Sequence, residues 1–253
     1  MTLADYPVLA SSLRVAHAVR ELLSDPGLNL GRLSDAVRIE PEITSTLLRM
    51  ANTAAFAPTE PVVDVYRAIS VIGTAQVRVL ALQVVMRHLV DGIRSPLARR
   101  YAERVWEHSL EVACIAEQVA RGQGLTPEQT HALGLLHDLP VLLFLNGSRD
   151  QPGLYADAQS LLAAARQWRG PSAARLARSL GVPELIVTDL AELDAGESGG
   201  DAVEAVRTAH ACVGVTYEFD RFKQRALSES MDELLEKAMA RKDALLDVVR
   251  MAG

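Results

Sequence analysis

Apolar residues recur at spacings of three and four along almost the whole chain, which is the signature of amphipathic helices. The strict alternation of a half-buried strand is not found. We therefore predict an all-α fold, a compact multi-helix domain with an additional amphipathic helix at its C-terminal end. The pattern predicts helices over residues 11–23, 30–38, 41–56, 64–73, 75–90, 97–122, one helix that contains the stretch HALGLLHDLPVLLFL (131–145), and then 156–168, 172–179, 183–193, 202–219 and 227–251.

Turn signals divide this pattern. Pro41 is well placed at the first position of a helix, and Thr74 is expected to cap the helix over 75–90. The segment DGIRSP (91–96) interrupts the apolar periodicity. We predict an N-terminal subregion over residues 1–95 and a second helical subregion over 96–253. The last helix, 227–251, is expected to cover its own domain rather than to form a dimer seam.

Composition narrows the class of protein. Apolar residues make up 49% of the 253 positions and aromatic residues only 4%, so the core must consist mainly of Leu, Val, Ala and Ile. The net charge of -6 argues against a nucleic-acid binder. Cys114 and Cys212 form neither a disulfide framework nor a CxxC pair. No signal peptide is evident and the apolar runs are too short to cross a bilayer. We expect a cytoplasmic protein without membrane insertion; its oligomeric state is not indicated.

The pair His137–Asp138 is the most unusual feature, because it lies in the middle of an almost entirely apolar stretch. Adjacent residues on a helix point about 100° apart, so both side chains reach one metal ion only at a helix end or a packing seam. A metal site there needs further ligands from other helices. His108 shares a helical face with apolar residues, and His210 lies among small apolar residues. The set His108, His137, Asp138 and His210 could therefore converge on one ion.

A structural interpretation is open beside this one. Buried histidines are often satisfied by a carbonyl or a carboxylate, and His108 and Asp138 could satisfy each other without a metal. Asp138 could equally cap a segment that starts at Pro140. Spacing alone favours this interpretation. His17, His88 and His131 are expected at a surface or an interface.

Other motifs are absent. The chain contains no GxxxxGK[ST] phosphate loop, no GxGxxG, no GxSxG and no HExxH. The four arginines of RSPLARRYAER (94–104) indicate either a solvated helix face or a docking patch for an acidic partner.

Two groups of motifs resemble known families. WEHSLEVACIAEQVA (106–120) followed by ALGLLHDLP (132–140) resembles the HD superfamily of helical metal-dependent phosphohydrolases. The segment over 39–82 is similar to the N-terminal part of the HDOD domain, an HD-related output domain of signalling proteins. Together the resemblance runs from about residue 5 to residue 220.

The resemblance implies a role for individual residues of the metal site. His108 matches the first HD ligand, and His137 and Asp138 match the motif itself. His210 stands where the family has a later Asp. The hydrolases continue their motif as x-Gly-Lys, whereas this chain has Leu139-Pro140-Val141. The segment 182–197 lacks the additional histidines of related phosphodiesterases. Phosphoryl transfer depends on such charges and ligands, so the chain resembles a degenerate phosphohydrolase.

The resemblance therefore implies a non-catalytic bacterial signal-transduction module that acts through contacts with other signalling proteins. Its pocket would be a remnant, or would hold a divalent metal (Mn, Fe, Mg or Zn) or a small phosphorylated ligand. Two alternatives stay open. One is an active metal-dependent phosphohydrolase on nucleotides or cyclic nucleotides. The other is a sensor that binds a nucleotide second messenger without turnover.

Overall fold

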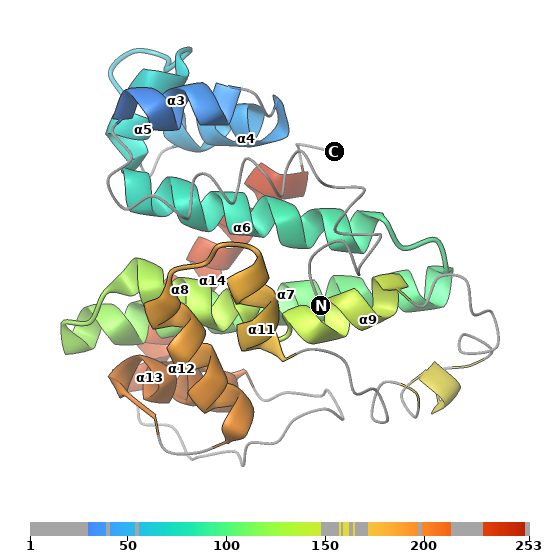
Figure 1. Ribbon diagram of the computed structural model, residues 1–253. Coiled ribbons are helices and arrows are strands. Elements are labelled where there is room, and N and C mark those ends of the chain that lie inside the picture. Colours follow the sequence, from blue (N-terminus) through green and yellow to red (C-terminus); the bar gives the residue numbers. More distant parts are fainter. Residues whose placement is uncertain are drawn as a thin grey trace.

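The computed structural model is all-helical in the part it describes, which confirms the predicted fold class (Figure 1). The described residues are 30–38, 41–53, 56–147, 157, 159–161, 164, 172–196, 199–213 and 230–250. The helices are α3 (Leu30–Arg38), α4 (Pro41–Ala51), α5 (Val65–Ile72), α6 (Thr74–Asp91), α7 (Pro96–Gln123), α8 (Pro127–Leu136), α9 (Leu139–Gly147), α11 (Ala173–Ser179), α12 (Glu184–Ala195), α13 (Asp201–Cys212) and α14 (Ser230–Arg250).

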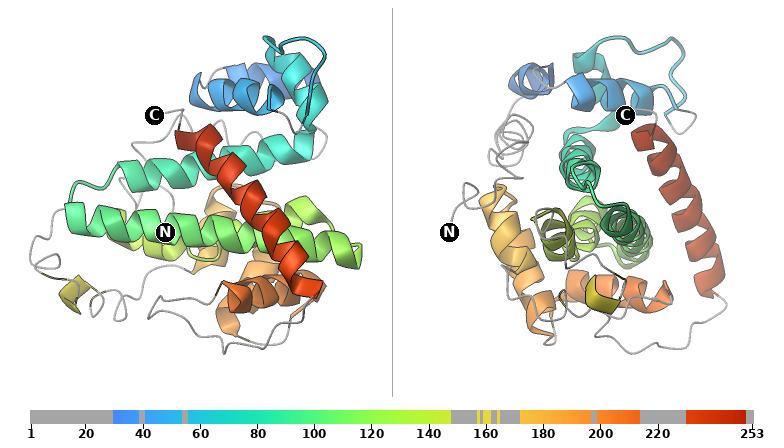
Figure 2. Two further views of the ribbon diagram at one scale, coloured as in Figure 1. Left: turned by 180° about the vertical axis from the view of Figure 1, so that it is seen from behind. Right: turned by 90° about the vertical axis from the view of Figure 1, so that its right-hand side faces the viewer.

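The long helix α7 is the centre of the arrangement. Helices α8 and α9 run beside it, α6 lies along the pair, and α3, α4 and α5 form a group beyond α6 (Figure 1). Helices α11, α12 and α13 cover the opposite end of this stack. Helix α14 crosses α7 on the side away from α11 (Figure 2). The helix predicted over 227–251 is thus present as α14, and it packs on α7 and α4 as expected of a covering helix.

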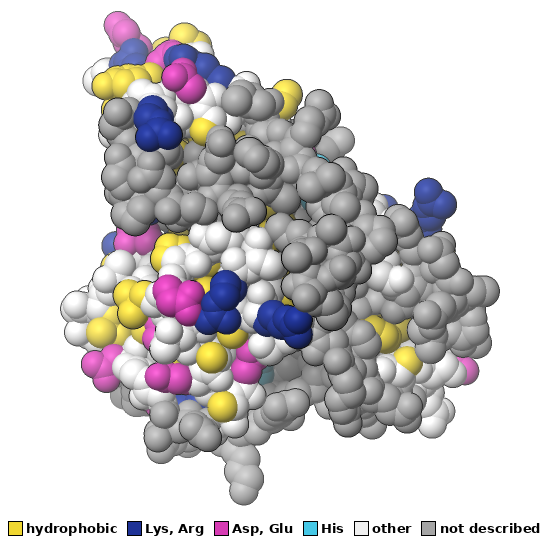
Figure 3. All heavy atoms as spheres, in the orientation of Figure 1, with side chains coloured by type: hydrophobic (Ala, Val, Ile, Leu, Met, Phe, Trp, Pro, Cys, Tyr) yellow, Lys and Arg dark blue, Asp and Glu magenta, His cyan; other side chains and the backbone are white. Residues whose placement is uncertain are grey.

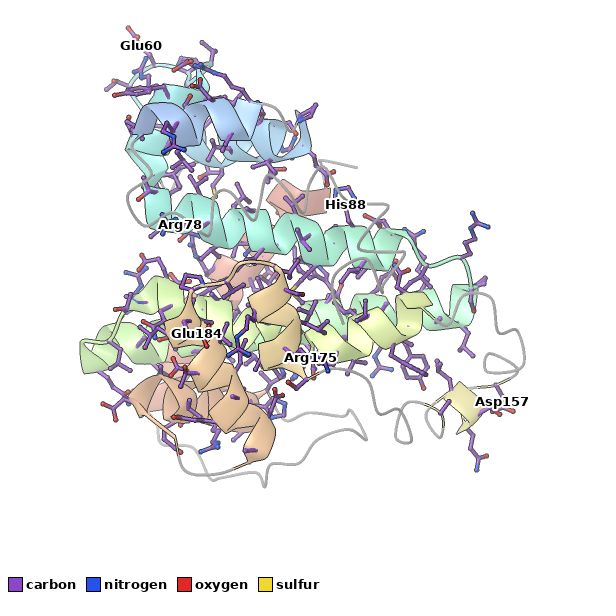
Figure 4. All side chains as sticks on the ribbon, viewed as in Figure 1. Glu60, Arg78, His88, Asp157, Arg175 and Glu184 are labelled. Atoms are coloured by element: carbon purple, nitrogen blue, oxygen red, sulfur yellow. The ribbon has the colours of Figure 1, made fainter. Side chains whose placement is uncertain are left out.

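The core is continuous through these layers. It is built mainly from Leu, Val, Ala and Ile, as the composition predicts, with Trp106 of α7 as its largest fully buried side chain. Buried polar groups tie helices together inside it. The Asn146 amide of α9 donates to the carbonyl oxygen of Leu89 in α6. His88, labelled in Figure 4, lies on the flank of α6 with its Nε2 2.7 Å from Oε2 of Glu42 in α4.

Helices α7 and α8 approach each other more closely than ordinary side chains permit. A Cβ added at Gly134 of α8 would lie 2.8 Å from the Cα of Ala113 in α7, a separation that real Cβ atoms do not adopt. Glycine and alanine are therefore required at this crossing. The crossing fixes α8 against α7 only three residues before His137.

Several predicted helix boundaries are wrong in an informative way. The single helix expected around the His-Asp pair is two helices, α8 and α9, with the break at residues 137–138. Thr74 is the first residue of α6 and not its cap. Gly73 occupies the cap position at a φ of 91°, a left-handed value that glycine tolerates. Helix α4 ends at Ala51, because the Asn52 side chain turns to bond the backbone of Val62.

Other predictions concern residues or properties that the structure does not describe. The helix predicted over 11–23 and His17 lie outside the described residues, as does most of the segment 156–168. The predicted boundary at residues 95/96 falls between α6 and α7, where Ser95 caps α7. That the two sides act as separate subregions stays a prediction.

The sequence predicts His131 at a surface or an interface, and its burial excludes the surface. Its Nδ1 lies 2.9 Å from Oε2 of Glu117 in α7, and its Nε2 lies 3.3 Å from the Gln83 amide of α6. Arg121 donates to the other oxygen of Glu117 at 2.7 Å, and Arg241 of α14 approaches the same carboxylate at 3.6 Å. One buried carboxylate thus connects α7, α8 and α14.

The visible surface carries mixed charge. Acidic and basic side chains are interspersed over α11 and α12 (Figure 3), where Arg178 pairs with Glu184. On α7, Arg99 pairs with Asp91 and Glu103, in keeping with a solvated helix face. Among the described helices, none alone has the length and apolar character to traverse a membrane. Only α5 and α6 taken together have both, and they are bent by 107°.

The helix crossing yields a first prediction. Gly134→Ala should destabilise the protein by about 1–3 kcal/mol, because the new methyl group meets backbone that cannot move aside. Gly122→Ala in α7 is the control. Its Cβ would meet nothing within 4 Å, so this change should be neutral or stabilising by up to about 1 kcal/mol. Urea unfolding measures both, and equal effects of the two changes would contradict the close contact.

The buried carboxylate yields a second prediction. Burial alone would raise the pKa of Glu117, but the hydrogen bond and charge of His131, the charge of Arg241 and the Arg121 hydrogen bond lower it to about 2. Its stabilising contribution is therefore present above pH 4.5 and is lost as the pH falls toward 2. Glu117→Gln should cost about 1–3 kcal/mol at pH 7, and less as the pH decreases through this window. A difference from the wild type that stays constant between about pH 5 and about pH 2.5 would contradict it.

Candidate metal centre

The break between α8 and α9 orients His137. Residue 137 ends α8, and its ring Nδ1 lies 2.6 Å from the carbonyl oxygen of Gly134 one turn earlier. Since a carbonyl only accepts, this Nδ1 carries a proton, and Nε2 is the ring nitrogen that can serve as a metal ligand. Metal-binding histidines have the same arrangement, in which the second ring nitrogen donates to a backbone carbonyl.

Three helices bring three imidazole rings together. His108 comes from α7, His137 from the end of α8 and His210 from α13. Their ring centroids lie 5.0–5.3 Å apart, and the rings meet edge to face. Each ring offers a nitrogen, and the three nitrogens lie within 4.8 Å of one another. The sequence prediction that these histidines converge therefore describes the observed geometry.

Two of the rings, His108 and His210, are held in their neutral form. Desolvation, the largest cause, and the nearby His137 and His210 together lower the pKa of His108 to about 2. Desolvation and His137 likewise lower the pKa of His210 to about 4, against a smaller opposing effect of Asp138. A neutral imidazole is the form that binds a metal ion, so no proton competes for these two rings near pH 7.

Asp138 lies at the edge of the triad and not inside it. Its carboxylate Oδ2 is 3.4 Å from Nε2 of His137 and 3.8 Å from Nε2 of His108. The second distance is too long for a hydrogen bond, so His108 and Asp138 do not satisfy each other directly. The Asp138 side chain is 24% exposed, whereas that of His108 is 2% exposed. Asp138 therefore lies where the centre meets solvent.

The donor set fits one ion of a borderline metal. A zinc ion with bonds of about 2.0–2.1 Å holds tetrahedral nitrogens roughly 3.3 Å apart. The longest nitrogen–nitrogen separation would have to shorten by up to about 1.5 Å to reach this value, which side-chain rotations provide. Three nitrogen ligands leave one position open, and the Asp138 carboxylate lies at the edge of the triad. Within the described part of the chain, no second cluster of three such ligands occurs.

Gly134 is the functional residue that sequence reasoning did not identify. It permits the close crossing with α7, and its carbonyl orients His137. The only sequence signal is a glycine inside an otherwise apolar helical pattern, which often has a packing reason.

Comparisons with solved structures show the same fold. A candidate metal-dependent phosphohydrolase of Shewanella amazonensis SB2B aligns over 94% of this chain and 89% of its own, with a TM-score of 0.62 and 19% identity. An HDOD domain protein of unknown function from Geobacter sulfurreducens aligns over 93% and 81%, with a TM-score of 0.58 and 20% identity. A candidate signal transduction protein of Marinobacter aquaeolei VT8 aligns over 94% and 58%, with a TM-score of 0.58 and 16% identity.

A search of curated proteins found no match. The family model of the HDOD domain matches residues 9–181, which is more than half of the chain. These residues include His108, His137 and Asp138, whereas His210 and α14 lie beyond the matched segment. The resemblance read from the sequence is confirmed: the chain belongs to the HDOD domain family.

Proposed function

We propose that this protein is a non-catalytic signalling module that holds one transition-metal ion and acts through contacts with other signalling proteins. The observation that supports it best is the histidine triad, whose three nitrogens face one point and whose His137 is oriented by a backbone carbonyl. The ion would connect α7, the end of α8 and α13, and so stabilise the arrangement of three helices.

The donors favour some metals over others. Imidazole suits zinc, iron, copper and nickel, whereas magnesium prefers oxygen ligands and retains much of its water. Of the four metals implied by the family resemblance, zinc and iron fit three histidines best. Asp138 would occupy the fourth position or accept a hydrogen bond from water bound there.

The same geometry argues against a two-metal hydrolase. His210 replaces the carboxylate of the family pattern, and Pro140 and Val141 replace its Gly and Lys. Val141 packs against the core instead of offering a charge to a phosphate. A second ion would need carboxylate or imidazole ligands that do not cluster elsewhere among the described residues.

One observation supports a second candidate function. A metal held by three histidines with an open position would activate a water molecule there. Asp138, whose Oδ2 lies 3.4 Å from Nε2 of His137, would be the group that accepts a proton from it. A single-metal phosphohydrolase acting on nucleotides is therefore the alternative to be tested. Among the proteins of similar fold, one is named a candidate phosphohydrolase and another a candidate signal transduction protein.

Metal analysis tests the centre itself. Freshly purified protein should contain about one equivalent of zinc or iron, or should take it up after chelation. His108→Ala and His210→Ala should each weaken binding by more than roughly 100-fold, because even the groups that orient a ligand contribute 10–100-fold. His88→Ala is the matched control and should bind as the wild type does. Protein that never takes up metal, or variants that bind as well as the wild type, would refute the centre.

A second experiment separates signalling from hydrolysis. His210→Asp should shift the preference toward manganese, because it restores an oxygen ligand. Neither this variant nor the metal-loaded wild type should hydrolyse a cyclic dinucleotide or a nucleoside triphosphate. Asp138→Asn is the companion variant. Turnover by the wild type that Asp138→Asn abolishes would establish the hydrolase in place of the signalling module.

A further inference from the structure

A second site lies at the other end of α8. A cavity of about 580 Å³ opens between the start of α6, the end of α7, the start of α8 and the flank of α14. Glu128, one of its lining residues, precedes His137 by nine residues, which is roughly 14 Å along a helix axis. The cavity is therefore separate from the histidine triad. Its volume lies in the range of small-ligand pockets.

One end of the cavity is positively charged. Arg121 of α7 and Arg241 of α14 both line it, and the buried carboxylate of Glu117 holds the two guanidinium groups in position. Each guanidinium has five donors. Arg121 uses one in its hydrogen bond to Glu117, and Nε of Arg241 is buried without a hydrogen bond. The two guanidinium groups carry two positive charges and the Glu117 carboxylate one negative charge, so this group of three side chains keeps a positive charge and unused hydrogen-bond donors.

The start of α6 faces the same space. Gly73, Thr74, Ala75 and Gln76 line the cavity, Gly73 gives α6 no side-chain cap, and the first turn contains no acidic residue. The amides of a first helical turn have no intrahelical acceptor, and the helix dipole there favours an anion. Space is open above Gly73, where an added Cβ would meet nothing within 4 Å. Figure 2 shows the start of α6, the end of α7 and α14 gathered at this end of the stack.

The opposite lining has a different chemistry. Phe56 and Ile72 supply an aromatic and an aliphatic surface, while Gln118 and Glu128 supply hydrogen-bonding groups. Glu128 would repel a second phosphate, but it accepts hydrogen bonds from ring amino groups or sugar hydroxyls. A ligand matched to both ends carries one phosphate and a flat ring with polar edges.

We infer that this cavity binds a nucleotide with a single phosphate, with Arg121, Arg241 and the first turn of α6 around the phosphate and Phe56 against the base. Binding would draw α14 toward α6 and α7, because α14 contributes Arg241 to the described lining of the cavity. The site is independent of the proposed metal centre and would persist in metal-free protein.

The test is calorimetric titration of the full chain with adenosine monophosphate, guanosine monophosphate and inorganic phosphate, with and without metal. At least one nucleotide should bind in the micromolar range and more tightly than phosphate. Ala75→Glu should weaken binding roughly tenfold or more, because it places a carboxylate beside the phosphate. The change should not harm folding, since Ala75 is exposed and an acidic residue suits a first helical turn.

Two further variants sharpen the result. Arg241→Gln should weaken binding to a similar extent. Ala191→Glu places the same charge at an exposed position of α12, outside the cavity, and should leave binding unchanged. Absence of nucleotide binding, equal binding by Ala75→Glu, or phosphate bound as tightly as the nucleotides would overturn the proposal. Binding that is lost in His210→Ala and kept in Ala75→Glu would place the nucleotide at the metal centre instead, and would also overturn it.

Discussion

The crossing of α7 and α8 at Gly134 is the contact on which the candidate site depends. His108 lies on one of these helices and His137 at the end of the other, so the distance between their rings follows from how closely the helix axes approach. The same glycine provides the carbonyl that orients His137. A larger residue would move α8 away and at once separate two ligands and rotate one of them. The close packing of α7 on α8 and the geometry of the metal ligands therefore both depend on this single contact.

Three histidines at one point in an apolar core need a physical justification. Each ring loses the water around its polar nitrogens, and the depressed pKa values of His108 and His210 are the direct sign of that loss. Hydrophobic side chains of similar volume would avoid this cost. Desolvated neutral imidazoles that face one another are, however, the state from which a metal ion is bound without displacing protons. The arrangement is costly for folding alone and well suited to coordination.

The sequence predicts the all-helical fold, because helical periodicity is a local property. It indicates only that His108, His137, Asp138 and His210 could converge, because the apolar surroundings of a residue do not fix which other residues it meets. It does not predict the break at residues 137–138, since apolar residues continue on both sides of the polar pair. It also does not show that His131 is buried. A buried His–Glu pair between two helices depends on the rotation of each helix about its axis, and Glu117 by itself reads as a solvated residue on an amphipathic helix. Such partners become visible only in three dimensions.

Helix α8 links the two regions of chemistry in this molecule. His131 near its middle bonds the carboxylate that positions Arg121 and Arg241, and His137 at its end belongs to the triad. The Gly134 crossing lies between them and leaves little room for α8 to slide along α7. A change in structure around Arg121 would therefore reach the triad through a rotation or tilt of α8 about this crossing. Spatial continuity alone does not establish energetic coupling, which requires that each site change the affinity of the other by the same factor. The metal affinity, measured with and without the nucleotide, would therefore decide whether α8 transmits a signal or only supports two separate sites.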